Sequence, residues 1–94
     1  MAMTKSTTIT WRSKEDWQNP QLTEARAAKL NEMHAAGKTD LSYDNEDPET
    51  ELIWTRFWID QAAAEEYIGF NMTEAATLNL VIVSTGIGDY TAPV

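Results

Sequence analysis

Residues 51–60, ELIWTRFWID, are the strongest strand signal in the chain and limit the folds that it can adopt. Isoleucine, tryptophan, threonine and phenylalanine are residue types that strands favour. Side chains on a strand alternate between the two faces of a sheet, so Trp54, Arg56 and Trp58 share one face and the intervening residues share the other. Both faces carry large apolar groups, and the sequence therefore predicts a sheet that is covered on both sides.

Alternation and helix caps predict the elements that precede this strand. Residues 7–12, TTITWR, alternate in polarity and predict a strand. Apolar residues at helical spacing predict an amphipathic helix over residues 20–36, with Asn19 as its N-cap and Gly37 as its stop. Residues 39–44 predict a weaker strand, and the turn-forming sequence NEDPE that follows predicts a hairpin loop.

The segment after the strong strand predicts two helices and a last strand. Asp60 is a suitable N-cap for the helix QAAAEEYIGF, whose buried stripe would include Tyr67. An unbroken helix would place the Asn71 amide within that stripe, so we expect the helix to break there and Asn71 to cap a second short helix. Residues 80–85, LVIVST, predict the final strand, which we expect Gly86 and the next glycine to end.

The order strand, helix, strand, strand, helix, strand predicts an α+β protein with a ferredoxin-like βαββαβ antiparallel sheet. We expect a single domain over residues 1–94, with an ordered core over about residues 7–86. Both helices would cover one face of the sheet, with the first and third strands at its centre. The strong strand would then point Ile53, Phe57 and Ile59 towards the helices.

The other face of the strong strand, with Trp54, Arg56 and Trp58, would lie away from the helices. Two exposed indoles would leave several hundred square ångströms of apolar surface, near the upper limit for a soluble monomer. A second copy of the chain, packed sheet against sheet about a two-fold axis, would cover such a face. The sequence therefore predicts a homodimer.

The net charge of −8 restricts the partners that the chain can bind. Phosphate backbones and anionic lipid surfaces repel an acidic protein, so we expect neither nucleic-acid nor membrane binding. The chain has no cysteine to supply thiolates, and its acidic stretch at residues 45–51 lacks the glycine of a calcium loop, so we predict no metal site. No apolar segment has the length of a signal-peptide core or a membrane span, and we expect a cytoplasmic protein.

The span TRFWIDQAAAEEYIGF, residues 55–70, resembles the strand-to-helix segment of the dimeric α/β-barrel superfamily. That superfamily contains antibiotic-biosynthesis monooxygenases and stress-responsive barrel proteins. The shared pattern is a strand end with an arginine, an aromatic residue and a tryptophan, followed by an acidic helix cap and an alanine-rich first turn. The resemblance implies a homodimer that closes into an α/β barrel around a pocket, and, because some members oxidise aromatic substrates without a metal or flavin, it implies no cofactor.

Haem degradation, which other members of that superfamily perform, does not fit this sequence. Those proteins use a histidine on the second helix together with an asparagine on the first strand. The single histidine of this chain, His34, is near the end of the first predicted helix, and the first predicted strand has no asparagine. The resemblance therefore does not extend to a haem site.

Arg56 is the most informative of the candidate pocket residues. A guanidinium removed from water needs an acceptor, so Arg56 requires either a carboxylate such as Asp44 or Asp60 or an anionic ligand. If Arg12 on the first strand shares this face, two arginines in one cavity favour an anionic guest. The tryptophans beside Arg56 either pack in a dimer seam or form the walls of a ligand site. The candidate pocket residues are Arg12, Trp54, Arg56, Trp58, Tyr67 and Asn71.

Three functions are consistent with these patterns. The leading hypothesis is a homodimer that binds a small anionic or aromatic molecule between its sheets. The alternative is a cofactor-independent monooxygenase acting on an aromatic substrate, with Trp54, Trp58, Tyr67 and Asn71 as walls and hydrogen-bond donors. The second alternative is a non-catalytic module whose acidic residues 45–51 bind a basic partner. The sequence contains no recognisable catalytic constellation and leaves the choice between enzyme and binding protein open.

Overall fold

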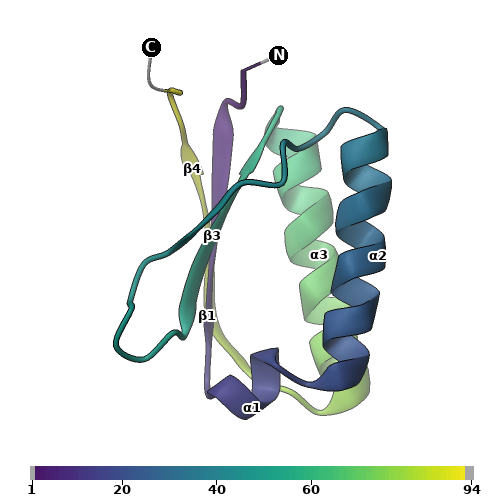
Figure 1. The fold of residues 1–94 in the computed structure, drawn as a ribbon, viewed down its shortest axis with the longest axis vertical. Helices are drawn as coiled ribbons and strands as arrows, with labels where there is room; N and C mark the ends of the chain where they lie inside the picture. The colour runs from purple at the N-terminus through teal and green to yellow at the C-terminus, as the bar shows by residue number, and fades with distance from the viewer. Residues whose placement is uncertain (1, 93–94) are drawn as a thin grey trace.

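The computed structural model of the chain describes residues 2–92. Four antiparallel strands form one sheet in the order β2-β3-β1-β4, and two long helices, α2 and α3, cover one of its faces (Figure 1). This confirms the predicted α+β class and is compatible with a ferredoxin-like arrangement. The strands are β1 (Lys5–Trp11), β2 (Tyr43–Asn45), β3 (Ile53–Trp58) and β4 (Ile82–Asp89), and the helices are α1 (Lys14–Trp17), α2 (Pro20–Ala35) and α3 (Gln61–Leu78).

Capping groups fix the helix ends where the sequence predicts them. The Asn19 side chain accepts bonds from two backbone N–H groups of the first turn of α2, at 2.9 and 3.1 Å, and Pro20 is the first residue of that helix. Gly37 follows α2 with a φ of +76°, a left-handed conformation that favours glycine. Asp60 accepts a bond of 2.8 Å from the backbone N–H three residues further on and caps α3. These three predictions are confirmed.

Strand β3 faces the opposite way from the prediction. Ile9 on β1 lies directly opposite Trp54 on β3, and Thr7 lies opposite Arg56. Directly opposed residues on neighbouring strands share a face. Ile9 packs in the core between the sheet and the helices, so Trp54, Arg56 and Trp58 face the helices as well. The prediction that they lie away from the helices is wrong.

The neighbouring strand β1 determines which face of β3 is covered. Alternation within β3 could not decide this, because both of its faces carry apolar side chains. Strand β1 is unambiguous, with Ile9 and Trp11 buried on one side and threonines on the other. Burying these two residues under the helices fixes the orientation of β3 through the register between the strands, and the bulky indoles then lie between the two layers.

Phe57 lies on the face of the sheet that has no helices. Its ring centre is 4.4 Å from that of Tyr90, just beyond β4, and the hydroxyls of two opposed threonines on this face are 3.1 Å apart. The prediction that Ile53 and Phe57 point towards the helices is therefore wrong, whereas Ile59, just beyond β3, packs against the core. The other positions of this face on the long strands are small and polar, namely Ser6, Thr10, Ser84, Gly86 and Gly88.

Two strands differ in length from the prediction. Strand β4 does not end at its glycines but continues to Asp89, because β1 offers backbone partners along its whole length, with Gly86 opposite Thr8. Strand β2 begins only at Tyr43. Leu41 adopts a left-handed φ of 67°, which interrupts the extended chain that alternation predicted over residues 39–44.

Helix α3 is continuous, so the predicted break at Asn71 is wrong. Asn71 lies in the middle of the helix and is only 1% exposed. Its Nδ2 donates a bond of 2.8 Å to the backbone oxygen of Tyr67, one turn earlier in the same helix. This bond within the helix provides a partner for the amide nitrogen and allows the side chain to occupy a buried helical position.

The core between the sheet and the helices contains Trp58, whose exposure is 0%. The indole Nε1 donates to the Thr7 hydroxyl at 2.9 Å, and the ring centre is 4.5 Å from that of Tyr67. Leu22 and Met33 of α2 are fully buried in the same core, as the predicted apolar stripe of that helix requires.

Asp16 joins three parts of the chain at the end of the sheet where β1 leads into α1. Its carboxylate accepts a bond from Arg12 at 3.0 Å and a bond from the backbone N–H of Val81, just before β4, at 3.1 Å. Its own backbone N–H donates to the Ser13 hydroxyl, which caps α1, at 3.3 Å. The bond from Arg12 holds the pKa of Asp16 below its ordinary value, against the opposing effect of burial.

We expect Asp16→Asn to lower the free energy of unfolding by about 2 kcal/mol at pH 7, because hydrogen bonds to charged groups contribute about 1.5–3 kcal/mol. A carboxylate whose pKa is lowered by folding stabilises the protein above its unfolded pKa of about 3.9 and loses that effect as the pH falls through the folded pKa. Urea unfolding of both proteins between pH 7 and pH 2.5 should therefore show a difference that shrinks in acid. The control is Glu15→Gln at the exposed neighbouring carboxylate, and an equal loss there would contradict the prediction.

Candidate ligand-binding site

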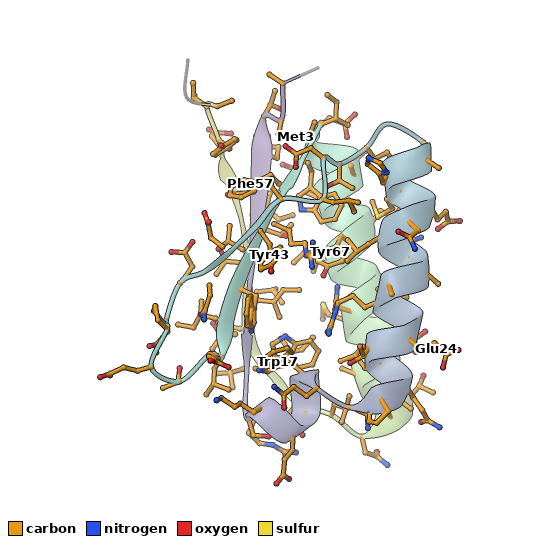
Figure 2. All side chains as sticks on the ribbon, in the orientation of Figure 1. Met3, Trp17, Glu24, Tyr43, Phe57 and Tyr67 are labelled. Carbon is orange, nitrogen blue, oxygen red and sulfur yellow. The ribbon has the colours of Figure 1, made fainter. Side chains whose placement is uncertain are left out.

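A cavity of about 320 Å³ lies between the sheet and the helices. Every helix and strand except β4 contributes to its wall, and α1 lies at one end of the gap between the two layers (Figure 1). Figure 2 shows Trp17 of α1 and Tyr67 of α3 within this gap, whereas Glu24 lies on the outer side of α2. The cavity is formed by residues of one chain, whereas the sequence predicted a pocket between the sheets of two copies.

Aromatic residues from five elements make up most of the residues that line the wall. The ring centres of Trp17 and Trp54 are 4.9 Å apart in an edge-to-face arrangement, and those of Tyr43 and Trp54 are 5.9 Å apart. Tyr43 is 57% exposed, so it lies where the cavity opens to solvent. Such a wall suits a flat apolar ligand. The aromatic residues that line the cavity are Trp11, Trp17, Tyr43, Trp54 and Tyr67.

Arg56 on β3 lines the cavity without a carboxylate partner. Its Nη1 donates to the backbone oxygen of Leu41 at 3.3 Å, and its guanidinium carbon lies 5.0 Å from the ring centre of Tyr43. No carboxylate among residues 2–92 lies within 4.0 Å of its nitrogens. The predicted partners are placed elsewhere, since Asp44 is on the helix-free face and Asp60 caps α3.

Arg26 on α2 is a second guanidinium in the wall, and the sequence patterns above did not identify it. Its Nη1 and Nη2 donate to the backbone oxygen of Trp17 at 3.3 and 3.2 Å. It too has no carboxylate within 4.0 Å in the described part of the chain. Spacing is the signal that reveals it: Arg26 lies four residues after Leu22 and four before Leu30, on the buried stripe of α2.

The two guanidiniums are close enough to affect each other. Burial lowers the pKa of Arg26 below its ordinary value, Tyr67 opposes this effect, and the positive charge of Arg56 adds to it. An arginine nevertheless keeps its proton at neutral pH. The cavity therefore collects two positive charges in a protein whose net charge is −8.

Asn71 and Trp17 each contribute a buried polar atom that has no partner. The Oδ1 atom of Asn71 and the Nε1 atom of Trp17 have no hydrogen-bond partner among residues 2–92. Buried polar atoms in folded proteins are bonded in the large majority of cases. One unpartnered acceptor and one unpartnered donor thus belong to residues that line the same cavity.

Two of the predicted pocket residues do not line the cavity. The side chain of Arg12 is 56% exposed and forms an ion pair with Asp16, because Arg12 follows the last residue of β1 and lies beyond the end of the strand. Trp58 packs against Tyr67 within the core instead of lining the cavity. Four predicted residues do line it: Trp54, Arg56, Tyr67 and Asn71.

Outside the cavity, we examined the acidic loop, possible metal sites and the helices of the described residues. The acidic loop between β2 and β3 uses some of its carboxylates within the chain, since Asp47 accepts a bond from the Thr50 hydroxyl at 2.7 Å and Glu51 pairs with Lys14 at 3.3 Å. Residues 2–92 contain no group of three histidine, cysteine, aspartate or glutamate side chains able to hold a metal ion. In the same part of the chain, no helix is both long and apolar enough to cross a membrane.

Comparison with known proteins bears on the fold alone. No protein-family model and no curated protein matches the sequence. The structure is similar to the crystal structure of PA3566 from Pseudomonas aeruginosa, with a TM-score of 0.54 and 19% sequence identity. The match covers 100% of this chain and 98% of that chain. At this identity the similarity shows a shared fold alone, and any assignment of function has to come from the cavity.

Proposed function

We propose that this protein binds a small aromatic anion in the cavity between its sheet and its helices. The pair Arg26 and Arg56 carries the proposal, because both line one aromatic cavity and both have only backbone oxygens as hydrogen-bond acceptors among residues 2–92. Both side chains are partly buried, and a charge that loses part of its water is stabilised by an opposite charge beside it. A ligand carboxylate supplies that charge and matches the fork of donors on a guanidinium.

The aromatic wall and the volume of the cavity define the rest of the ligand. Trp17, Trp54 and Tyr43 offer ring faces and edges against which a planar ring can pack. The cavity of about 320 Å³ has room for roughly ten water molecules at ~30 Å³ each. The proposed ligand class is therefore an arylcarboxylate with one or two rings.

Calorimetric titration with acids and their uncharged amides tests this proposal. Benzoate, phenylacetate and 2-naphthoate would each be compared with the corresponding carboxamide. We expect the acids to bind at least ~10-fold more tightly, because one charged hydrogen bond contributes about 1.5–3 kcal/mol and 1.4 kcal/mol is a factor of ten. Equal affinity for acids and amides, or binding of none of the six compounds, would contradict the proposal.

We further propose a ferredoxin-like domain that forms a homodimer through the helix-free face of its sheet. The tryptophans no longer support a dimer, since the helices of the same chain cover them. The dimer is instead supported by the absence of charge from this face. On β1, β3 and β4 its positions carry no charged residue, although the net charge of the chain is −8. Two acidic copies repel least through an uncharged face, and the partly exposed Ile53 adds apolar area to it. A monomeric mass in light scattering at micromolar concentration would contradict this assembly.

A second candidate function is cofactor-independent monooxygenation of an aromatic substrate. One observation favours it: Trp54, Tyr67 and Asn71, which the sequence pattern proposed for this role, line the same cavity. The substrate would be an electron-rich phenol or quinol that itself supplies the electrons for reducing oxygen. Oxygen uptake with a panel of quinols tests this candidate. Uptake that disappears in Arg56→Ala would support it, and the absence of uptake across the panel would remove it.

A further inference from the structure

We infer that the ligand carries two carboxylates at separate positions of a planar aromatic ring, one bound by Arg26 and the other by Arg56. Both arginines line the same cavity. The inference rests on the proposed binding of an aromatic anion and narrows the ligand class from arylcarboxylates to aromatic dicarboxylates. It adds a requirement to the proposed function, which a ligand with a single carboxylate already satisfies.

The charged residues in the cavity wall are all positive. Arg26 and Arg56 belong to the lining, and no aspartate or glutamate of the described residues does. Burial lowers the pKa of Arg26, and the positive charge of Arg56 lowers it further, so the two charges repel each other. A single carboxylate neutralises one of these charges and leaves the other uncompensated, whereas a ligand with two carboxylates neutralises both.

The two guanidiniums are held at different places on the wall. Arg26 donates two bonds to the backbone oxygen of Trp17 in α1, at 3.3 and 3.2 Å. Arg56 donates one bond to the backbone oxygen of Leu41, just before β2, at 3.3 Å. Each guanidinium has further N–H groups, and these have no acceptor among residues 2–92. The arginines therefore offer two anchoring points that are fixed by separate parts of the backbone.

A row of three aromatic rings connects the two guanidiniums. The guanidinium carbon of Arg26 lies 6.0 Å from the ring centre of Trp17, and that of Arg56 lies 5.0 Å from the ring centre of Tyr43. Trp54 joins these two rings, with its centre 4.9 Å from that of Trp17 and 5.9 Å from that of Tyr43. A planar ring that packs against Trp54 therefore has a guanidinium beyond each neighbouring aromatic residue, and an acidic group at each end of the ligand can bind one of them.

Diacids and their monoamides test this inference by calorimetric titration. Isophthalate and terephthalate would be compared with 3-carbamoylbenzoate and 4-carbamoylbenzoate, which have the same ring and a similar shape but carry one carboxylate instead of two. We expect the better diacid to bind at least ~10-fold more tightly than its monoamide, because its second carboxylate forms charged hydrogen bonds that the amide does not. The net charge of −8 repels a dianion more strongly than a monoanion, so such a preference has to come from the charges in the cavity.

Single variants show whether each arginine binds its own carboxylate. Arg26→Met and Arg56→Met should each weaken binding of the better diacid by at least ~10-fold and remove its preference over the monoamide. The affinity for the monoamide should change by less than about threefold, because the remaining arginine still binds its single carboxylate. The matched control Arg12→Met, at an ion-paired arginine outside the cavity, should retain the preference for the diacid.

The outcomes distinguish this inference from the function on which it rests. Equal affinity for diacids and monoamides overturns the inference and leaves anion binding intact, whereas a protein that binds neither these four compounds nor the arylcarboxylates titrated above overturns both. A preference that persists in Arg26→Met or Arg56→Met overturns the role of that arginine. Tighter binding of the phenyl phosphate dianion than of both diacids would show that the arginines converge on one doubly charged group, and it overturns the inference. If a variant does not fold, the diacid and monoamide affinities of the unmodified protein decide.

Discussion

Replacing Trp58 with alanine is expected to lower the free energy of unfolding by about 3–5 kcal/mol, the range found when a buried aromatic side chain is removed from a core. The indole is fully buried, and its ring packs against Tyr67 with 4.5 Å between the ring centres. The variant also takes the hydrogen bond at 2.9 Å away from the Thr7 hydroxyl, which is itself buried. Domains are stable by only about 5–15 kcal/mol, so the variant would approach the limit of folding. Urea unfolding followed by far-ultraviolet circular dichroism measures the loss.

Trp54→Ala is the matched control for this change. Trp54 is on the same face of the same strand, but it lines the cavity, so part of its ring already faces empty space. Removing it deletes fewer packing contacts and should cost less stability than removing Trp58. Equal losses in the two variants would show that the cavity wall is packed as tightly as the core, contrary to the structure.

The double variant Arg26→Met, Arg56→Met is expected to weaken arylcarboxylate binding by at least ~100-fold, since each lost charged hydrogen bond costs about 1.5–3 kcal/mol. The free energy of unfolding should stay the same or rise. The two partly buried guanidiniums have no carboxylate partner among residues 2–92, so replacing them with apolar residues of similar volume breaks no ion pair. Calorimetric titration with phenylacetate and urea unfolding measure the two effects.

Arg12→Met is the control with the opposite expected result. Arg12 carries the same charge but lies outside the cavity and is paired with Asp16. We expect it to leave phenylacetate affinity unchanged and to reduce stability, because the Asp16 carboxylate loses its charged partner. If Arg12→Met weakens binding as much as the double variant does, net charge and not the cavity explains the affinity.

Local signals were sufficient to predict the order of the main elements and three of the helix ends. An asparagine followed by proline starts α2, a glycine in a left-handed conformation follows it, and Asp60 starts α3. Each of these signals acts over three or four residues, so each can be recognised in the sequence without knowing the rest of the fold.

The orientation of β3 could not be predicted in this way, because it depends on residues far away in the chain. Both faces of β3 carry apolar groups, and only the register with β1, which places Ile9 opposite Trp54, shows which face the helices cover. The length of β4 is a similar case. Its glycines weaken a strand in isolation, but hydrogen bonds to β1 extend the strand past them.

The sequence singled out some residues of the candidate site but not its place in the fold. Trp54, Arg56, Tyr67 and Asn71 line a cavity between the sheet and the helices of one chain, whereas the sequence predicted a pocket between two copies, and Asn71 lies in a helix that was expected to break there. The second arginine of the site is Arg26 and not Arg12. A charged residue within an apolar helical stripe is easily dismissed as an interruption of the stripe, whereas in this helix it marks the place where the stripe borders a cavity.

The absence of β4 from the cavity wall has a consequence for how this protein can diverge in evolution. This edge strand, with Val83 63% exposed, pairs with β1 but contributes no residue to the lining. Substitutions along β4 can therefore accumulate under selection for folding or for contacts with other chains while the cavity wall stays the same. Related proteins could differ widely along this strand and still share the proposed ligand, and the residues that line the cavity would then identify functional relatives better than overall sequence identity.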